Sequence, residues 1–254
     1  MSGFKDHFSA VAGGYAAFRP RYGARLAADL AALCTRHRLA WDAGCGSGQF
    51  SALLPAHFET VVATDASADQ IAAATPHPQI AYRAARAEAS GLPEGRVDLI
   101  TVAQAAHWFD LPAFYAECRR VAAPGAVLAL ISYENMILPP ALAPVFQHFY
   151  KDVLGPFWPA DRLHVENGYA DLPFPFDPLP LPPQQLEAEW DAAAVLGYIG
   201  TWSAVRGLLA AEGEGRLNAF RQQFTEAWEA AVGPGRRLSL VWPVSVRVGR
   251  VLPA

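Results

Sequence analysis

The sequence predicts a doubly wound, mostly parallel α/β sheet. Residues 39–54 have the pattern of a short strand, a glycine-rich loop and a helix, and strand and helix patterns then alternate as far as residue 132. Such alternation is the signature of helices packed on both faces of a parallel sheet. The chain has 254 residues, of which 52% are hydrophobic, so it is long enough for one large domain with a sizeable core.

The first predicted elements follow from periodicity and composition. Alanines and leucines recur at helical spacing from Tyr22 to about Thr35. Residues 40–43 form a short apolar strand that leads into the glycine loop. Residues 49–54 have helical composition, and Pro55 is expected to end that helix.

The glycine loop indicates a nucleoside-containing ligand. Gly44, Gly46 and Gly48 alternate, and a missing Cβ lets a ligand press against bare backbone at a helix start. The dinucleotide fingerprint has a further glycine three residues after its second, and Gln49 stands in that place. Asp65 ends the next apolar run, where an acid accepts hydrogen bonds from ribose hydroxyls. Together these features favour an adenosine-bearing ligand over a nicotinamide dinucleotide.

The later elements continue the same alternation. Ser67 is expected to begin a short helix as a capping box, and Asp110 is expected to cap a longer one. The predicted strands are 80–83, 97–103, 126–132, 186–190 and 238–251, and the predicted helices are 67–74, 111–121, 192–211 and 216–232. The stripe of Phe220, Phe224 and Trp228 at four-residue spacing is expected to lie in the core.

Residues 134–183 differ from the rest of the chain in composition. They contain many prolines among aromatic residues, which excludes central strands and makes disorder improbable on composition. We interpret this stretch as an inserted lid over the ligand cleft, with Phe174 and Phe176 as acceptor contacts. An oligomer interface is the alternative, since exposed aromatic residues serve both purposes.

Four motifs in order resemble those of the class I S-adenosylmethionine-dependent methyltransferases: D-A-G-C-G-S-G-Q, A-T-D-A-S, A-E-A-S-G-L-P and V-D-L-I-T-V-A-Q-A-A-H-W-F. With the first residues, F-K-D-H-F-S-A-V-A-G-G-Y-A-A-F-R-P-R-Y, they are similar to the small-molecule branch that includes trans-aconitate methyltransferases. The resemblance covers about residues 1–133 and is looser beyond. It implies a seven-stranded Rossmann-like fold, a single domain over 1–254, and S-adenosylmethionine as cofactor with S-adenosylhomocysteine as product.

The resemblance also implies which residues bind the cofactor. Residues 1–22 would form a flap in which Tyr15 and Arg19 face the methionine end, where an arginine suits a carboxylate. An N-terminal helix packed on the domain is the alternative. Ala87 and Glu88 would contact the adenine. The remaining cofactor contacts implied are Asp42, Gly44, Cys45, Gly46, Gly48, Asp65, Ala66, Gln70, Gln104 and Ala105.

Residues 104–109 follow the fourth strand, where open parallel sheets place their ligands. His107 is the candidate catalytic residue, and three roles stay open: a general base, a hydrogen-bond donor, or a structural side chain beside Trp108. Trp108, Tyr198 and Trp202 are candidate acceptor contacts. A carboxylate acceptor needs no base, whereas a phenol, thiol or amine would more readily use one.

Composition excludes several other classes. A net charge of −4 gives no footprint for nucleic acid, and no apolar run approaches a membrane span. Three scattered cysteines and no evident secretory signal indicate reduced thiols in the cytosol. The seven histidines stand singly, so we expect no metal site. No hydrolase elbow or P-loop motif occurs.

We therefore predict a cytoplasmic methyltransferase that acts on a small organic acceptor. The alternatives are a nicotinamide-dependent oxidoreductase, a methyltransferase for protein or nucleic acid, and a protein that binds the cofactor without catalysis. The oligomeric state does not follow from the sequence.

Overall fold

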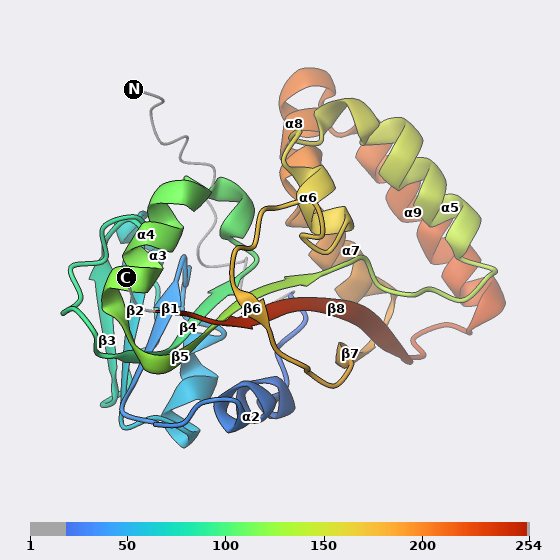
Figure 1. Ribbon diagram of the computed structural model, residues 1–254. Coiled ribbons are helices and arrows are strands. Elements are labelled where there is room, and N and C mark those ends of the chain that lie inside the picture. The colour runs from blue at the N-terminus through green and yellow to red at the C-terminus, as the bar shows by residue number, and fades with distance from the viewer. Residues whose placement is uncertain (1–18, 253–254) are drawn as a thin grey trace.

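The computed structural model describes residues 19–252, and its centre is one mixed β-sheet (Figure 1). The strands are β1 (Leu39–Ala43), β2 (Thr60–Asp65), β3 (Ile80–Ala84), β4 (Val97–Ala103), β5 (Ala122–Tyr133), β6 (Asp177–Pro178), β7 (Gln184–Trp190) and β8 (Leu238–Arg250). Their order is β3-β2-β1-β4-β5-β8-β6, and β7 also pairs with β8. The first five strands are parallel, whereas β8 is antiparallel to β5. This is the Rossmann-like topology predicted, but the described sheet has eight strands where seven were predicted, because β6 and β7 both pair with the far side of β8.

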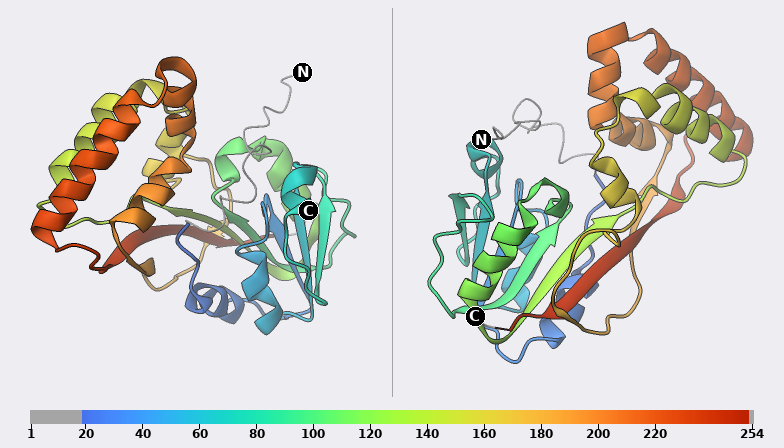
Figure 2. Two further views of the ribbon diagram at one scale, coloured as in Figure 1. Left: turned by 180° about the vertical axis from the view of Figure 1, so that it is seen from behind. Right: turned by 45° about the horizontal axis from the view of Figure 1, so that its top comes forward.

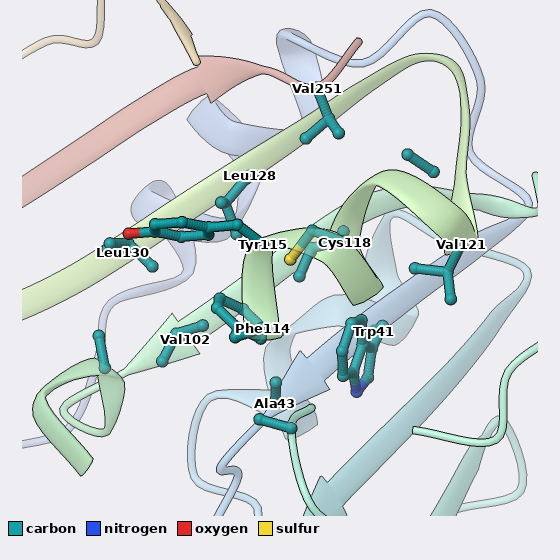
Figure 3. Close-up of a cluster of buried hydrophobic side chains, with 14 of the residues drawn as sticks. Trp41, Ala43, Val102, Phe114, Tyr115, Cys118, Val121, Leu128, Leu130 and Val251 are labelled. Atoms are coloured by element: carbon teal, nitrogen blue, oxygen red, sulfur yellow. The ribbon is translucent and has the colours of Figure 1, made fainter. Parts of the chain in front are cut away.

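Alternate residues of the strands face opposite helices. Trp41 and Ile100 point into the cluster beneath α4 (Leu111–Val121), whereas Ala40 and Leu99 point toward α2 (Ala24–Ala32). Figure 3 shows the first cluster, in which Trp41, Phe114 and Cys118 meet between α4 and the sheet. Because side chains alternate along a strand, a sheet buried on both faces favours apolar residues at successive positions. The doubly wound arrangement follows from that pattern.

The capping predictions agree with the structure. Asp110 accepts a hydrogen bond from the backbone N–H of Ala113 at 3.3 Å, and α4 begins at the next residue. Ser67 accepts one from the N–H of Gln70 at 3.3 Å and begins α3 (Ala68–Ala72). A cap satisfies an amide that has no partner inside the helix, which fixes where the helix begins.

Two helical predictions were wrong in form. The stretch after the glycine loop is a 3-10 helix, η2 (Ser51–Ala56), and it contains Pro55 instead of ending before it. The long helix predicted over 192–211 is two helices, α7 (Ala192–Gly200) and α8 (Ser203–Glu212), which bend by 74° at the break. Thr201 donates its hydroxyl to the carbonyl of Tyr198 at 2.7 Å, which satisfies a carbonyl at the end of α7.

A second group of helices, which we call the cap, lies over the end of β5 and β8 (Figure 1). Its elements are α5 (Ala143–Gln147), the π-helix η4 (His148–Val153), η5 (Gly155–Phe157), α7, α8 and α9 (Gly215–Ala231). Both views in Figure 2 show α5 beside α9. The rings of Phe149 and Phe220 stack there at 3.8 Å between centroids, and Phe220 is buried as predicted, with Phe224 and Trp228. The cap therefore joins two segments of the chain through an aromatic core.

The segment predicted as an inserted lid divides between two parts of the fold. Residues 143–157 pack with the later helices in the cap. Helix α6 (Arg162–Glu166) lies at the junction, with Val165 in the sheet's core cluster. Residues 172–176 pack against α4 and β8.

No single helix in the described part of the chain is long and apolar enough to cross a bilayer, and α7 and α8, which pass that test only together, are bent.

Candidate functional site

The loops after β1 and β2 are tied together by one carboxylate. Asp65 accepts the backbone N–H of Gly46 on one oxygen and that of Ser67 on the other, both at 2.8 Å. The N–H of Cys45 donates to the carbonyl of Thr64 at 3.0 Å. A carboxylate has about four lone-pair positions, so Asp65 retains capacity for two further donors such as ribose hydroxyls. Its place at the carboxyl ends of adjacent strands agrees with the prediction.

The glycine loop has one packed side and one open side. Gly44 has φ +66°, and a Cβ there would lie 2.6 Å from the Cβ of Ala105, so the loop touches the segment after β4. Gly46 has φ +55°, and among the described residues a Cβ there would meet only the Oε1 of Gln70, at 3.6 Å. A positive φ favours glycine at both positions. At Gly46 the bare backbone faces space that a ligand can occupy.

Asp42 lies beneath the loop. Its side chain is fully buried and accepts hydroxyl hydrogen bonds from Ser51 at 2.6 Å and Thr101 at 2.7 Å. Burial raises the pKa of Asp42 to about 6, although the two hydroxyls oppose that shift. Both oxygens are therefore engaged in joining β1, β4 and η2. The buried side chain supports the loop from beneath, and a direct cofactor contact by Asp42 stays a prediction.

The other predicted cofactor residues are more dispersed. Glu88 pairs with Arg86 at 3.2 Å and accepts the N–H of Asp110 at 3.0 Å, so its carboxylate anchors the start of α4. Ala87 is buried in the core cluster, and Ala66 is exposed. The Sγ of Cys45 lies 3.4 Å from the carbonyl of Gly46, and burial raises its pKa. Gly48 packs against Tyr82.

The tail of β4 turns sharply toward the cap. Gln104 has φ +59°, which is uncommon outside glycine, and its Nε2 donates to the carbonyl of Tyr133 at 3.1 Å. That bond joins the end of β4 to the end of β5. The 3-10 turn η3 (Ala106–Trp108) follows and presents His107 and Trp108.

A cavity of about 100 Å³ lies between this tail, α6 and the start of α8. It is lined by Arg19, Gln104, His107, Trp108, Trp158, Pro159, Arg162, Val165, Trp202, Ser203 and Arg206. Three of these described residues are arginines, three are tryptophans and none is an acid. The cavity therefore suits a small ligand that is anionic and apolar at once.

The arginines differ in how they are held. The guanidinium of Arg162 lies 4.9 Å from the ring centre of Trp158, and it donates to the hydroxyl of Tyr150 at 3.2 Å and the side chain of Asn135 at 3.3 Å. Arg19 donates to the hydroxyl of Tyr133 at 3.3 Å. Arg206 is half-buried, and its side chain has no hydrogen bond or ion pair to another described residue. Arg206 is thus the cation most available to a ligand.

His107 is neutral in this environment. Its Nδ1 lies 2.9 Å from the hydroxyl of Tyr169, and its ring is tilted against Trp108 with centroids 4.6 Å apart. Burial, and then the positive charges of Arg162 and His164, lower the pKa of His107 to about 3. A ring with so low a pKa is a weak proton acceptor, which disfavours the general-base role.

Several predicted acceptor contacts do not reach the cavity. Phe176 packs edge-on against Tyr115 at 5.1 Å, and Phe174 lies at 5.3 Å from Phe176 in the same core cluster. Tyr198 is buried behind Trp202 at 5.5 Å. Trp108 and Trp202 do line the cavity. Tyr15, which was predicted as a cofactor contact, lies outside the described residues, as do residues 1–18 of the predicted flap over 1–22.

Sequence reasoning missed Trp158, Arg162 and Arg206 as cavity residues. None belongs to a motif, and each reaches the cavity only through the packing of the cap. No local pattern marked the break that places Trp202 and Arg206 beyond the bend, because Thr201 caps α7 in an ordinary αR conformation. No group of three or more His, Cys, Asp or Glu in residues 19–252 could hold a metal ion.

Comparisons with known proteins agree with this geometry. Residues 41–130 match the family described as a methyltransferase domain. Over 245 residues the chain is 31% identical to a candidate methyltransferase of Dictyostelium discoideum, a match that covers 95% of this chain and 93% of that protein. The structure of a candidate type II methyltransferase from Anaeromyxobacter dehalogenans has 43% identity, covers 93% of this chain and 100% of its own, and has a TM-score of 0.86. A candidate methyltransferase from Bacillus halodurans C-125, at 20% identity, a TM-score of 0.51, and coverage of 91% and 99%, shares the fold.

The ordered loops, the sheet topology and a relative matched along nearly its whole length lead to one assignment. The chain belongs to the class I S-adenosylmethionine-dependent methyltransferases.

Proposed function

We propose that this protein transfers a methyl group from S-adenosylmethionine to a carboxylate of a small organic acid. The observation that carries the proposal is a cavity with three arginines and no acidic side chain among its described lining residues. The resemblance to the trans-aconitate branch favours the same class of acceptor.

The cofactor would be held by residues of the sheet. Asp65 has the capacity to accept ribose hydroxyls, Gly46 offers an open backbone, and Arg19 suits the methionine carboxylate. When bound, S-adenosylmethionine supplies a methyl group on a sulfonium, from which a neutral thioether leaves. The protein then needs only to align the acceptor and to exclude water.

The acceptor would be held between the sheet and the cap. Arg206 and Arg162 would pair with its carboxylates, and Trp108, Trp158 and Trp202 would cover its apolar part. A carboxylate is already ionised at neutral pH, so no proton has to be removed when its oxygen takes the methyl group. A phenol, thiol or amine would ask for a base, and a His107 with its pKa near 3 fits that task poorly.

The test is a screen with cofactor labelled in its methyl group. We expect label in one or more carboxylic acids of the panel, released by alkali as expected for a methyl ester, and none in matched phenols and amines. Replacing Arg206 with methionine should lower kcat/KM for the acid by on the order of 10- to 100-fold, the loss of a hydrogen bond to a charged group.

Arg221→Met is the matched control, because Arg221 lies on the exposed face of α9 and contacts Asn218. It should leave the kinetics unchanged. Label confined to phenols or amines, or an acid methylated equally well by Arg206→Met, would contradict the proposal.

A further inference from the structure

Tyr169 is held rigidly behind His107. Its side chain is fully buried, and its backbone has φ +61°, a conformation that a non-glycine residue adopts only when its surroundings enforce it. The backbone N–H donates to the carbonyl of His164 at 2.7 Å, and its carbonyl accepts the guanidinium of Arg247 at 2.7 Å. Both sides of the residue are therefore anchored, which fixes the ring and its hydroxyl.

The hydroxyl of Tyr169 is fully buried and has one proton to donate. Among the described residues, its recorded hydrogen-bond partner is the Nδ1 of His107, 2.9 Å away. A buried hydroxyl proton without an acceptor is costly, so the phenol donates to Nδ1. In a neutral imidazole one nitrogen accepts and the other carries the hydrogen. An Nδ1 that accepts from Tyr169 leaves the proton on Nε2.

The charges around the ring keep it in the neutral form. Arg162 and His164, both on α6, oppose a positive charge on the ring, and they pair on their other sides with Glu166 at 3.7 Å and Asp171 at 2.7 Å. Arg19 and Arg206 line the same cavity, and its described lining contains no acid. An imidazolium would therefore be desolvated and repelled at once. With Nδ1 engaged and no described residue recorded as a partner of Nε2, the cavity is where Nε2–H can find an acceptor.

We propose that Tyr169 is a positioning residue that holds His107 as the Nε2–H tautomer, so that His107 donates a hydrogen bond to the methyl acceptor. His107 then complements the arginines as a neutral donor and takes no proton during the transfer. The identity of the group that receives this bond rests on the proposed function, whereas the tautomer is a property of the protein alone.

Nitrogen NMR of histidine-labelled protein tests the tautomer without cofactor or acceptor. The signal of His107 is assigned from its absence in His107→Gln. We expect the coupling pattern of an Nε2–H ring in the wild type, unchanged from about pH 5 to pH 8, the range in which an ordinary histidine titrates. An Nδ1–H ring, or a ring that becomes protonated in this range, would overturn the proposal.

The variant Tyr169→Phe removes the hydroxyl and retains the ring. We expect its His107 signal to lose the single-tautomer pattern, while Tyr115→Phe, which loses a hydroxyl bond to the carbonyl of Pro173 elsewhere in the core, keeps it. A Tyr169→Phe spectrum identical to wild type would show that Tyr169 positions nothing. If this variant does not fold, the wild-type spectrum alone still decides the tautomer.

Kinetics connect the tautomer to the acceptor. Once a substrate is known, His107→Gln, whose amide N–H stands near the place of Nε2, should retain more activity than His107→Ala, and the loss should fall on the acceptor rather than on cofactor binding. Equal losses in both variants would remove the donor role. A screen that finds no methylated acid, together with an intact Nε2–H signal, would defeat the proposed function and leave the tautomer standing.

Discussion

The loops of the sheet and the cap are built from different interactions. At the sheet, backbone amides and buried polar groups set the geometry: Asp65 bridges two loops, and Asp42 joins β1, β4 and η2 through hydroxyls. In the cap, aromatic rings set the geometry. The ring of Phe149 stacks on that of Phe220 with centroids 3.8 Å apart, and the rings of Trp158 and Trp202 have centroids 5.5 Å apart.

This difference indicates a division of tasks. Backbone hydrogen bonds at strand ends are determined by the topology, and they present the same polar groups whatever the neighbouring side chains are. A wall of tryptophan and arginine is determined by side chains, so its shape and charge depend on each residue. We infer that the sheet binds the part of the reaction that is common to the family, and that the cap selects the acceptor.

The largest effect should come from a residue that sequence reasoning assigned to the acceptor. Phe176→Ala should lower the free energy of unfolding by about 3–5 kcal/mol, because the ring is buried against Tyr115 and Arg119 in the sheet's core. Denaturant titration measures it, and Leu163→Ala, at an exposed position of α6, is the control. A stable Phe176→Ala variant with altered acceptor kinetics would restore the lid interpretation.

The glycine loop should respond in binding. Gly46→Val should weaken binding of S-adenosylhomocysteine by at least about 3 kcal/mol, since a branched residue at positive φ is strained and fills the open side of the loop. Gly91 also has a positive φ, and no described residue lies within 4 Å of a Cβ built there, so Gly91→Val controls for strain in a loop elsewhere. Calorimetric titration would refute the loop assignment if both variants bound like wild type.

The buried carboxyl of Asp42 should make stability depend on pH. Its pKa is raised from 3.8 to about 6, so the folded state binds a proton that the unfolded state releases. The contribution of Asp42 to stability is therefore greatest at low pH and falls by about 2–3 kcal/mol as pH rises from 4 to 6. The free energy of unfolding of wild type, measured relative to Asp42→Asn, should therefore fall by this amount as pH rises across that range. A difference between the two proteins that does not change with pH would contradict the raised pKa.

The sheet was largely predictable from the sequence, and the cap was not. The bounds of β4 and α4 agree with prediction because an apolar run and an Asp cap mark them locally. No sequence pattern within residues 134–183 indicates that this segment divides between two cores. Residues 143–157 pack in one cluster with α7, α8 and α9, which follow in the chain by tens of residues.

The same contrast holds for the site. Asp65 and the glycine loop lie where the motif order predicted, since strand ends bring them together. The charge of the cavity comes from Arg162 and Arg206, which no spacing rule connects, and the role of His107 depends on Tyr169, 62 residues away. The prediction that Phe174 and Phe176 contact the acceptor was made from composition. Composition shows that aromatic rings are present, but it does not show whether they pack into the core, as these two do.

The most direct test of this division compares one variant from each region in a single titration with S-adenosylhomocysteine. Asp65→Ala should weaken binding by about 1–3 kcal/mol, the cost of leaving polar groups unmatched. Arg206→Met should bind within a factor of a few of wild type, because we propose that Arg206, which lines the cavity, contacts the acceptor and not the cofactor. Loss of cofactor affinity in Arg206→Met, with Asp65→Ala unaffected and both variants folded, would contradict the account.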